Sequence, residues 1–183
     1  MAGLIEMIIN NPSLIQTIAK QVGIDTATAE SIVRQLAPIL MGGAKSNLQS
    51  DKDSGSLIKK IESDNYAEMF DKPEEAVKKK DLKEIGDDIL ADLTGSKENS
   101  REVAKHVEQE TGVSSNIIKM ILPMLAPMII GALTKSTGEK SDLTEASGDT
   151  NSMTAILVEL IDQDHDGSMI DDVMGMATKF IFS

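Results

Sequence analysis

Apolar residues recur along this chain at intervals of three and four positions, the spacing that places them on one face of an α-helix. One such stripe ends at Gly95 and consists of Ile85, Ile89, Leu90 and Leu93. Helix starts are indicated at Pro12 and Pro73, because the missing N–H of proline costs nothing in the first helical turn. Alternation of β-branched residues is absent, and the 183 residues include only four aromatic side chains. The pattern therefore predicts an all-α fold.

One stretch of sequence occurs twice, with an offset of 89 residues between Gly23–Gly42 and Gly112–Gly131. Both copies carry Leu-Ala-Pro followed four residues later by glycine. A single pair at this spacing is not a solenoid, so we expect two related helical hairpins within one domain. A proline inside a helix removes one hydrogen bond and clashes with the preceding turn. Pro38, Pro123 and Pro127 therefore either kink an apolar helix or separate two short ones. We prefer the break, because a kinked apolar helix must still satisfy its freed carbonyls.

The distribution of charge divides the chain into three parts. Residues 1–135 are expected to form a multihelical body, residues 136–152 a flexible acidic linker, and residues 153–183 a helix–loop–helix. Residues 136–172 hold ten acidic residues and one lysine, so most of the net charge of −12 lies near the C-terminus. A strongly negative charge disfavours nucleic acid and anionic membranes as partners.

The most informative chemistry lies between Asp162 and Asp172, within the predicted helix–loop–helix. Asp162, Asp164 and Asp166 stand at alternate positions before Gly167. This is how a loop is built to wrap oxygen ligands around a hard cation, with the glycine allowing the sharp turn. The backbone carbonyl of Ser168 would be the next ligand.

The end of this loop departs from the standard calcium-binding pattern, which places a bidentate glutamate at position 12. Position 12 is Val173, which cannot coordinate, so we expect Asp171 or Asp172 to close a shortened EF-hand-like loop. Ca²⁺ is favoured over Mg²⁺ because of the ligand count. Apolar residues at helical spacing flank the loop on both sides: Met153, Ile156, Leu157, Leu160 and Ile161, then Ile170, Val173, Met174, Ala177, Phe180 and Ile181.

An acidic surface turn that caps the following helix is the alternative interpretation of this loop. Against it stands the repulsion among five carboxylates within eleven residues that include no lysine or arginine. His165, at position 4, is expected to be solvated. The cation-binding hypothesis is therefore preferred, and a metal-free scaffold is kept as the alternative.

The fourteen residues Met120–Leu133 contain no polar side chain. A spanning helix needs about 20 residues, and runs of 10–14 are usually buried core. We therefore predict a core helix and no membrane span. Met120, Met124 and Met128 form a stripe that we assign to the core rather than to a groove for a partner.

Signatures of catalysis are few. The chain has no cysteine, which excludes disulfides, zinc–thiolate sites and thiol catalysis, and it has two histidines. No nucleophile elbow, zinc motif, phosphate loop or dinucleotide fingerprint is present. A carboxylate-based hydrolase would need two acids with displaced pKa values, and nothing in the sequence selects such a pair. We predict that the protein is not an enzyme.

The N-terminus has no basic region and carries Glu6 inside its apolar stretch, so a secretory signal is not expected. A cytoplasmic protein is predicted.

Two segments carry a resemblance to a known family. Gly86-Asp-Asp-Ile-Leu-Ala-Asp-Leu-Thr-Gly95 is followed by a polar helix, Gly112-Val, and then Leu122-Pro-Met-Leu-Ala-Pro-Met-Ile-Ile-Gly131. This arrangement resembles the YidB-like family of bacterial proteins of unknown function, over most of residues 1–135. The resemblance implies an all-helical body and an acidic C-terminal segment like residues 162–182. It brings no catalytic residues, and the first copy departs from the pattern with Arg34 where the second has Pro123. A helical interaction protein with an unidentified protein partner is the resulting prediction.

Overall fold

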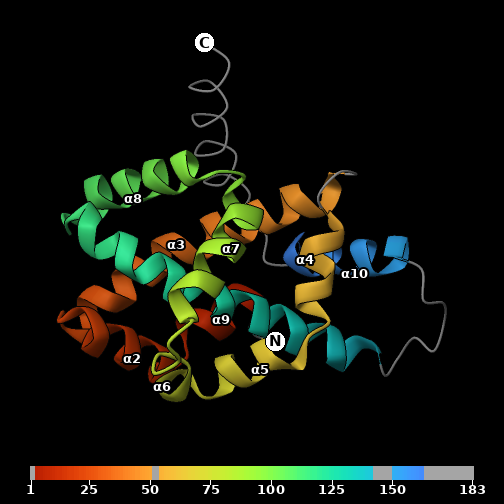
Figure 1. Cartoon of the computed structure of the whole chain (residues 1–183), viewed down its shortest axis with the longest axis horizontal. Helices are drawn as coiled ribbons and strands as arrows, with labels where there is room; N and C mark the ends of the chain where they lie inside the picture. The colour runs from red at the N-terminus through yellow and green to blue at the C-terminus, as the bar shows by residue number, and fades with distance from the viewer. Residues whose placement is uncertain (1–2, 51–53, 142–149, 163–183) are drawn as a thin grey trace, which may run out of the picture.

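The computed structural model describes residues 3–50, 54–141 and 150–162 (Figure 1). In these ranges the chain forms ten helices and no strand, which confirms the all-α prediction. The two longest are α3 (Thr26–Gln49) and α9 (Ser115–Ser141). The other elements are α1 (Leu4–Ile9), α2 (Pro12–Val22), α4 (Ser54–Ile61), α5 (Asp64–Asp71), α6 (Pro73–Ala76), α7 (Leu82–Thr94), α8 (Lys97–Thr111) and α10 (Thr150–Asp162).

Helix α9 crosses the middle of the molecule and forms its largest interfaces with α5 and α7 (Figure 1). Its side chains from Ile121 to Leu133 are buried, except for Met124, which is half-buried. By length and composition the part Ser115–Thr137 is able to cross a membrane, but 72% of its most apolar window lies inside the protein. Such burial is typical of the central helix of a helical core.

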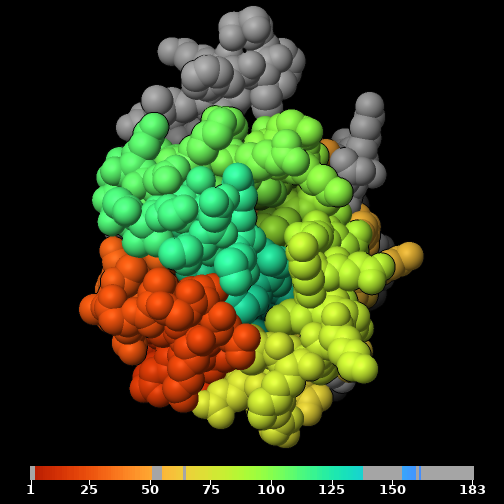
Figure 2. Space-filling view, turned by 60° about the vertical axis from the view of Figure 1, so that its left-hand side comes forward, coloured from red at the N-terminus to blue at the C-terminus, as the bar shows by residue number. Residues whose placement is uncertain are grey.

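The methionine stripe runs from the surface into this core. Met128 is fully buried, Met124 is half-buried, and the side chain of Met120 is 54% exposed. Figure 2 shows the start of α9, in teal, reaching the surface between the red N-terminal helices and the yellow-green residues around α6 and the start of α7. The assignment of the stripe to the core therefore holds for its C-terminal end.

The expected helix breaks at the three prolines are wrong. Pro38 lies inside α3, and Pro123 and Pro127 lie inside α9, without interruption of either helix. Pro127 has no N–H for the carbonyl of Pro123, one turn earlier. Gly86 of α7 lies directly against this freed oxygen, since a Cβ atom on Gly86 would be only 2.0 Å from it. The freed carbonyl therefore lies in a close crossing of α7 and α9, and α9 continues through it as one helix.

Two other crossings are equally close. A Cβ atom on Gly43 of α3 would lie 1.7 Å from the carbonyl oxygen of Leu93, in the last turn of α7. A Cβ atom on Gly131 of α9 would lie 2.1 Å from the carbonyl oxygen of Tyr66, in α5. The absence of a side chain at each of these glycines therefore allows backbone contact between two helices: α3 with α7, α7 with α9, and α9 with α5.

The two repeat copies have the same local structure where they begin. Gly23 ends α2 and Gly112 ends α8, each with a φ angle of +74°. The residues that begin the two long helices, Thr26 and Ser115, also match at the repeat offset. Both turns are left-handed caps that favour glycine. The equivalence of the two hairpins as whole units stays a prediction.

The last described residues form the end of α9 and helix α10. Residues 136–141, expected in the linker, continue α9, and residues 150–152 belong to α10. Helix α10 packs mainly against α3, with further contacts to α4 and α9. Its Leu157 is fully buried and Ile161 is 8% exposed, and both belong to the main hydrophobic core.

Candidate functional site

The predicted cation ligands fall almost entirely outside the described residues. Asp162 is the last residue of α10. The other ligands, Asp164, Asp166, Ser168, Asp171 and Asp172, lie in residues 163–183 and are not described. Among the residues that are described, no three histidine, aspartate or glutamate side chains are grouped so that they could hold a metal ion.

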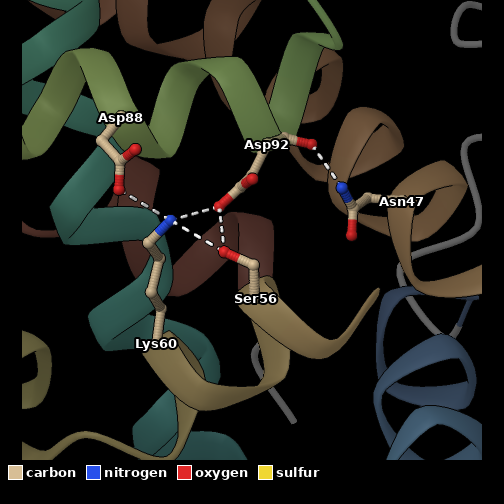
Figure 3. Close-up of polar contacts among 5 residues, drawn as sticks. All are labelled: Asn47, Ser56, Lys60, Asp88 and Asp92. Carbon is tan, nitrogen blue, oxygen red and sulfur yellow. Dashed lines mark hydrogen bonds and ion pairs between the residues drawn. The ribbon is translucent and has the colours of Figure 1, made fainter. Parts of the chain in front are cut away.

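A polar cluster that the sequence did not indicate lies between α4 and α7. Ser56 and Lys60 are one turn apart on α4, and Asp88 and Asp92 are one turn apart on α7, so each pair lies on one face of its helix. The buried residues of α4, Leu57, Ile58 and Ile61, attach its apolar face to the core. We call Ser56, Lys60, Asp88 and Asp92 the Lys60 cluster (Figure 3).

The ammonium group of Lys60 is the centre of this cluster. Its Nζ atom forms ion pairs with Asp88 Oδ2, at 2.9 Å, and with Asp92 Oδ2, and it donates a hydrogen bond to Ser56 Oγ at 3.3 Å. Ser56 Oγ in turn donates to Asp92 Oδ2 at 3.3 Å. The side chains of Lys60 and Asp92 are 15% and 17% exposed, whereas that of Asp88 is 70% exposed. The Lys60–Asp92 pair is therefore the shielded part of the cluster, and Asp88 is its solvent side.

The charges within the cluster favour protonated Lys60. Burial acts to lower the pKa of Lys60, but the hydrogen bonds and charges of Asp92 and Asp88 outweigh it and raise this pKa above its ordinary value of 10.5. Nearby, burial raises the pKa of Tyr66, and the two aspartates add to that effect while the charge of Lys60 opposes it. At neutral pH the cluster consequently contains an ammonium ion, and the phenol of the nearby Tyr66 is neutral.

These protonation states decide what the cluster can do chemically. A serine next to a lysine acts as a nucleophile only when the lysine is neutral and takes the hydroxyl proton. Lys60 is held protonated by two aspartates, so it is a donor to Ser56 Oγ and not a base. The arrangement is suited to clamping α4 onto α7 rather than to activating Ser56.

Asp92 also connects α7 to α3 through its main chain. The last carbonyl groups of a helix have no partners within it. Asn47 Nδ2 of α3 donates to the carbonyl oxygen of Asp92 at 2.9 Å, and Asn99 Nδ2 donates to that of Thr94 at 2.6 Å. The carbonyl of Leu93, between them, lies against Gly43. The end of α7 is thus fixed by side chains and backbone from two other segments.

The side-chain amide of Asn47 also contains an oxygen atom for which the described residues provide no hydrogen-bond donor. Asn47 Oδ1 is buried and has no hydrogen-bond partner among the described residues. In Figure 3 this oxygen points away from Asp92. Such an atom is uncommon in folded proteins and costs free energy relative to a hydrogen-bonded carbonyl.

The sequence alone indicates the Lys60 cluster only in part. The spacing of Ser56 and Lys60, and that of Asp88 and Asp92, identifies two polar helix faces of opposite charge. Nothing in the sequence indicates that α4 and α7 face each other, because residues 62–81 separate them.

Comparison with known proteins shows a match to a family model. A family described as bacterial protein of unknown function (DUF937) matches residues 6–136. This range includes the Lys60 cluster and most of α9, and it excludes α10. No curated protein and no solved structure matches the chain. The narrower YidB-like assignment stays a prediction.

Proposed function

The chain belongs to DUF937, a family of bacterial proteins of unknown function, and we propose that it acts as a non-enzymatic helical interaction protein that binds a divalent cation near its C-terminus. Asp162, Asp164, Asp166, the carbonyl of Ser168 and one of Asp171 and Asp172 would be the ligands. Ca²⁺ is preferred to Mg²⁺ because such a loop supplies many oxygen atoms.

The position of α10 carries this proposal. Leu157 and Ile161 anchor α10 on the body, and Asp162, the first expected ligand, ends this helix. A cation held by Asp162 and the residues after it would connect a docked helix to the apolar segment Ile170–Ile181. A divalent cation bound to four of the five carboxylates offsets part of their mutual repulsion, which amounts to roughly 1 kcal/mol per close pair in water. Cation binding would thereby set the direction of the last apolar segment relative to the body.

The proposal also covers the cellular location of the protein and the kind of partner that it binds. We place it in the bacterial cytoplasm, without a membrane span and with a protein as partner. The burial of the apolar window of α9 and the net charge of −12 support this assignment. The matched starts of α3 and α9 support two pseudo-repeated hairpins within the body.

A metal-free interaction module is the second candidate function. Its support is that α10 docks through Leu157 and Ile161, which are apolar and need no ion. In this case the acidic residues after Asp162 would cap the following helix. A carboxylate-based hydrolase is the least supported candidate, because Asp88 and Asp92 are both engaged by Lys60.

Calorimetric titration of Ca²⁺, and then of Mg²⁺, into the chelator-treated full chain tests the proposal. We expect micromolar or tighter binding, lost in the Asp164→Ala/Asp166→Ala double variant. The matched control is Asp142→Ala/Glu145→Ala, which removes the same charge from the acidic segment outside the loop. Absence of binding heat in the unaltered chain would favour the metal-free module. An equal loss of Ca²⁺ affinity in both double variants would show that overall negative charge attracts the ion and that the loop does not bind it specifically.

A further inference from the structure

The surface on which α10 lies has the properties of a helix-docking site. We call the parts of α3, α4 and α9 in contact with this helix the α10 seat. Leu157 and Ile161 are one turn apart and are buried in the seat, whereas Ala155 and Glu159 on the same helix are exposed. Anchors at positions i and i+4 on one face are how an amphipathic helix is recognised by an apolar groove.

The seat belongs to the family unit, and its occupant does not. Residues 6–136 contain α3, α4 and nearly all of the part of α9 that is buried, while α10 begins at Thr150. Without α10, the family unit would leave the apolar seat in contact with water. Soluble proteins seldom leave a large apolar patch exposed, and such a patch usually marks an interaction surface.

The seat also has support that does not depend on α10. Helix α4, one of its walls, is attached to α7 on its polar face by the Lys60 cluster. Helix α3, its main wall, is fixed to the end of α7 by Asn47 and Gly43. Removing α10 would therefore leave the walls of the seat in place.

We propose that the α10 seat is a helix-docking surface and that α10 is an exchangeable occupant, replaceable by the same segment from another molecule. The fitting occupant is an amphipathic helix with two branched aliphatic anchors one turn apart, as in residues 150–162. The inference deepens the proposed role as an interaction protein, but it is independent of cation binding, because the anchors are apolar.

The test uses full-length chains in the presence of a chelator and a fluorescent peptide of residues 150–162 as the probe. Leu157→Asp places a charge in the seat and should release α10 from it. Ala155→Asp is the matched control, since it adds the same charge to the exposed face of the same helix. We expect the peptide to bind the Leu157→Asp chain at least tenfold more tightly than the unaltered or Ala155→Asp chains. A peptide carrying the same Leu157→Asp change should not bind.

Hydrogen exchange of the same variants shows whether the body remains folded. Amide protection in α7 and α9 should be unchanged in the Leu157→Asp chain, with faster exchange confined to α10 and the seat. Equal peptide binding by all three chains, or no binding by any, would overturn the proposal. Loss of protection in α7 and α9 would also overturn it, since α10 would then be an integral part of the core. Cation binding is tested by a separate experiment, the calcium calorimetry in chelator-free buffer. A failure of the cation-binding proposal is therefore distinguishable from a failure of the helix-docking proposal.

Discussion

The crossing of α7 and α9 predicts a large effect for a one-carbon change, Gly86→Ala. A Cβ atom at this position would lie 2.0 Å from the carbonyl oxygen of Pro123 and 2.6 Å from its carbonyl carbon and its Cα. All three are backbone atoms of a buried helix, so no side-chain rotation can relieve the contact. Separation of α7 from α9 is the remaining response, and it opens the core on both sides of the crossing.

The expected change in the free energy of unfolding of Gly86→Ala is the sum of two opposing contributions. Alanine is favoured over glycine inside a helix by about 1 kcal/mol. Forcing extra volume into a well-packed contact typically costs about 1–3 kcal/mol, and a backbone obstacle places this site at the upper end. The net expectation is a loss of about 2 kcal/mol in the free energy of unfolding, the difference between these terms.

Urea unfolding followed by far-ultraviolet circular dichroism measures this loss. Gly55→Ala is the matched control, because Gly55 is also helical, in α4, and a Cβ atom there would have no neighbour within 4 Å. The control should be as stable as the unaltered protein or gain up to about 1 kcal/mol. A Gly86→Ala chain that equals or exceeds the stability of the unaltered protein would refute the close backbone crossing.

Two further predictions concern the Lys60 cluster. Lys60→Met should lower the free energy of unfolding by about 1–3 kcal/mol, because it leaves the shielded Asp92 carboxylate without its partner. The exposed neighbour Lys59→Met should change it by no more than about 0.5 kcal/mol, and equal effects of the two in urea unfolding would contradict the role of the cluster. The raised pKa of Lys60 also makes this contribution dependent on pH: it is complete below 10.5, the unfolded value, and is lost as the pH rises through the higher folded value. The stability difference between the unaltered and Lys60→Met chains should therefore shrink in buffers well above pH 10.5, and a constant difference would argue against the ion pair.

Local features of the fold were accessible from the sequence because they depend on residues close in the chain. Helices α2 and α6 begin at Pro12 and Pro73, and α7 ends at Gly95, as the start and stop signals predict. Ile121–Leu133 of α9 were correctly placed in the core, with Met124 half-buried, whereas Met120, the first of the fourteen apolar residues, is 54% exposed. In each case the deciding interaction lies within one or two helical turns.

Features that depend on contacts between residues far apart in the chain could not be predicted from the sequence. The close approach of α7 to α9 at Pro123 depends on Gly86, which belongs to another helix. The Lys60 cluster depends on the facing of α4 and α7, and the end of α7 depends on Asn47. For the cation loop only Asp162 is described, so the remaining ligands stay a prediction from the sequence.

The three glycine contacts have a consequence for how this chain can vary. Gly43, Gly86 and Gly131 join α3 to α7, α7 to α9 and α9 to α5 in an unbroken series. The spacing of these four helices is therefore set by main-chain atoms, and no choice of larger side chain can reproduce it. Substitutions elsewhere in the core can be compensated by a neighbour of complementary size, but at these positions no neighbour can yield. Sequence variation in this four-helix frame is therefore restricted to positions other than the three glycines, whereas α10 contains no glycine and packs through side chains that a neighbour of complementary size can match.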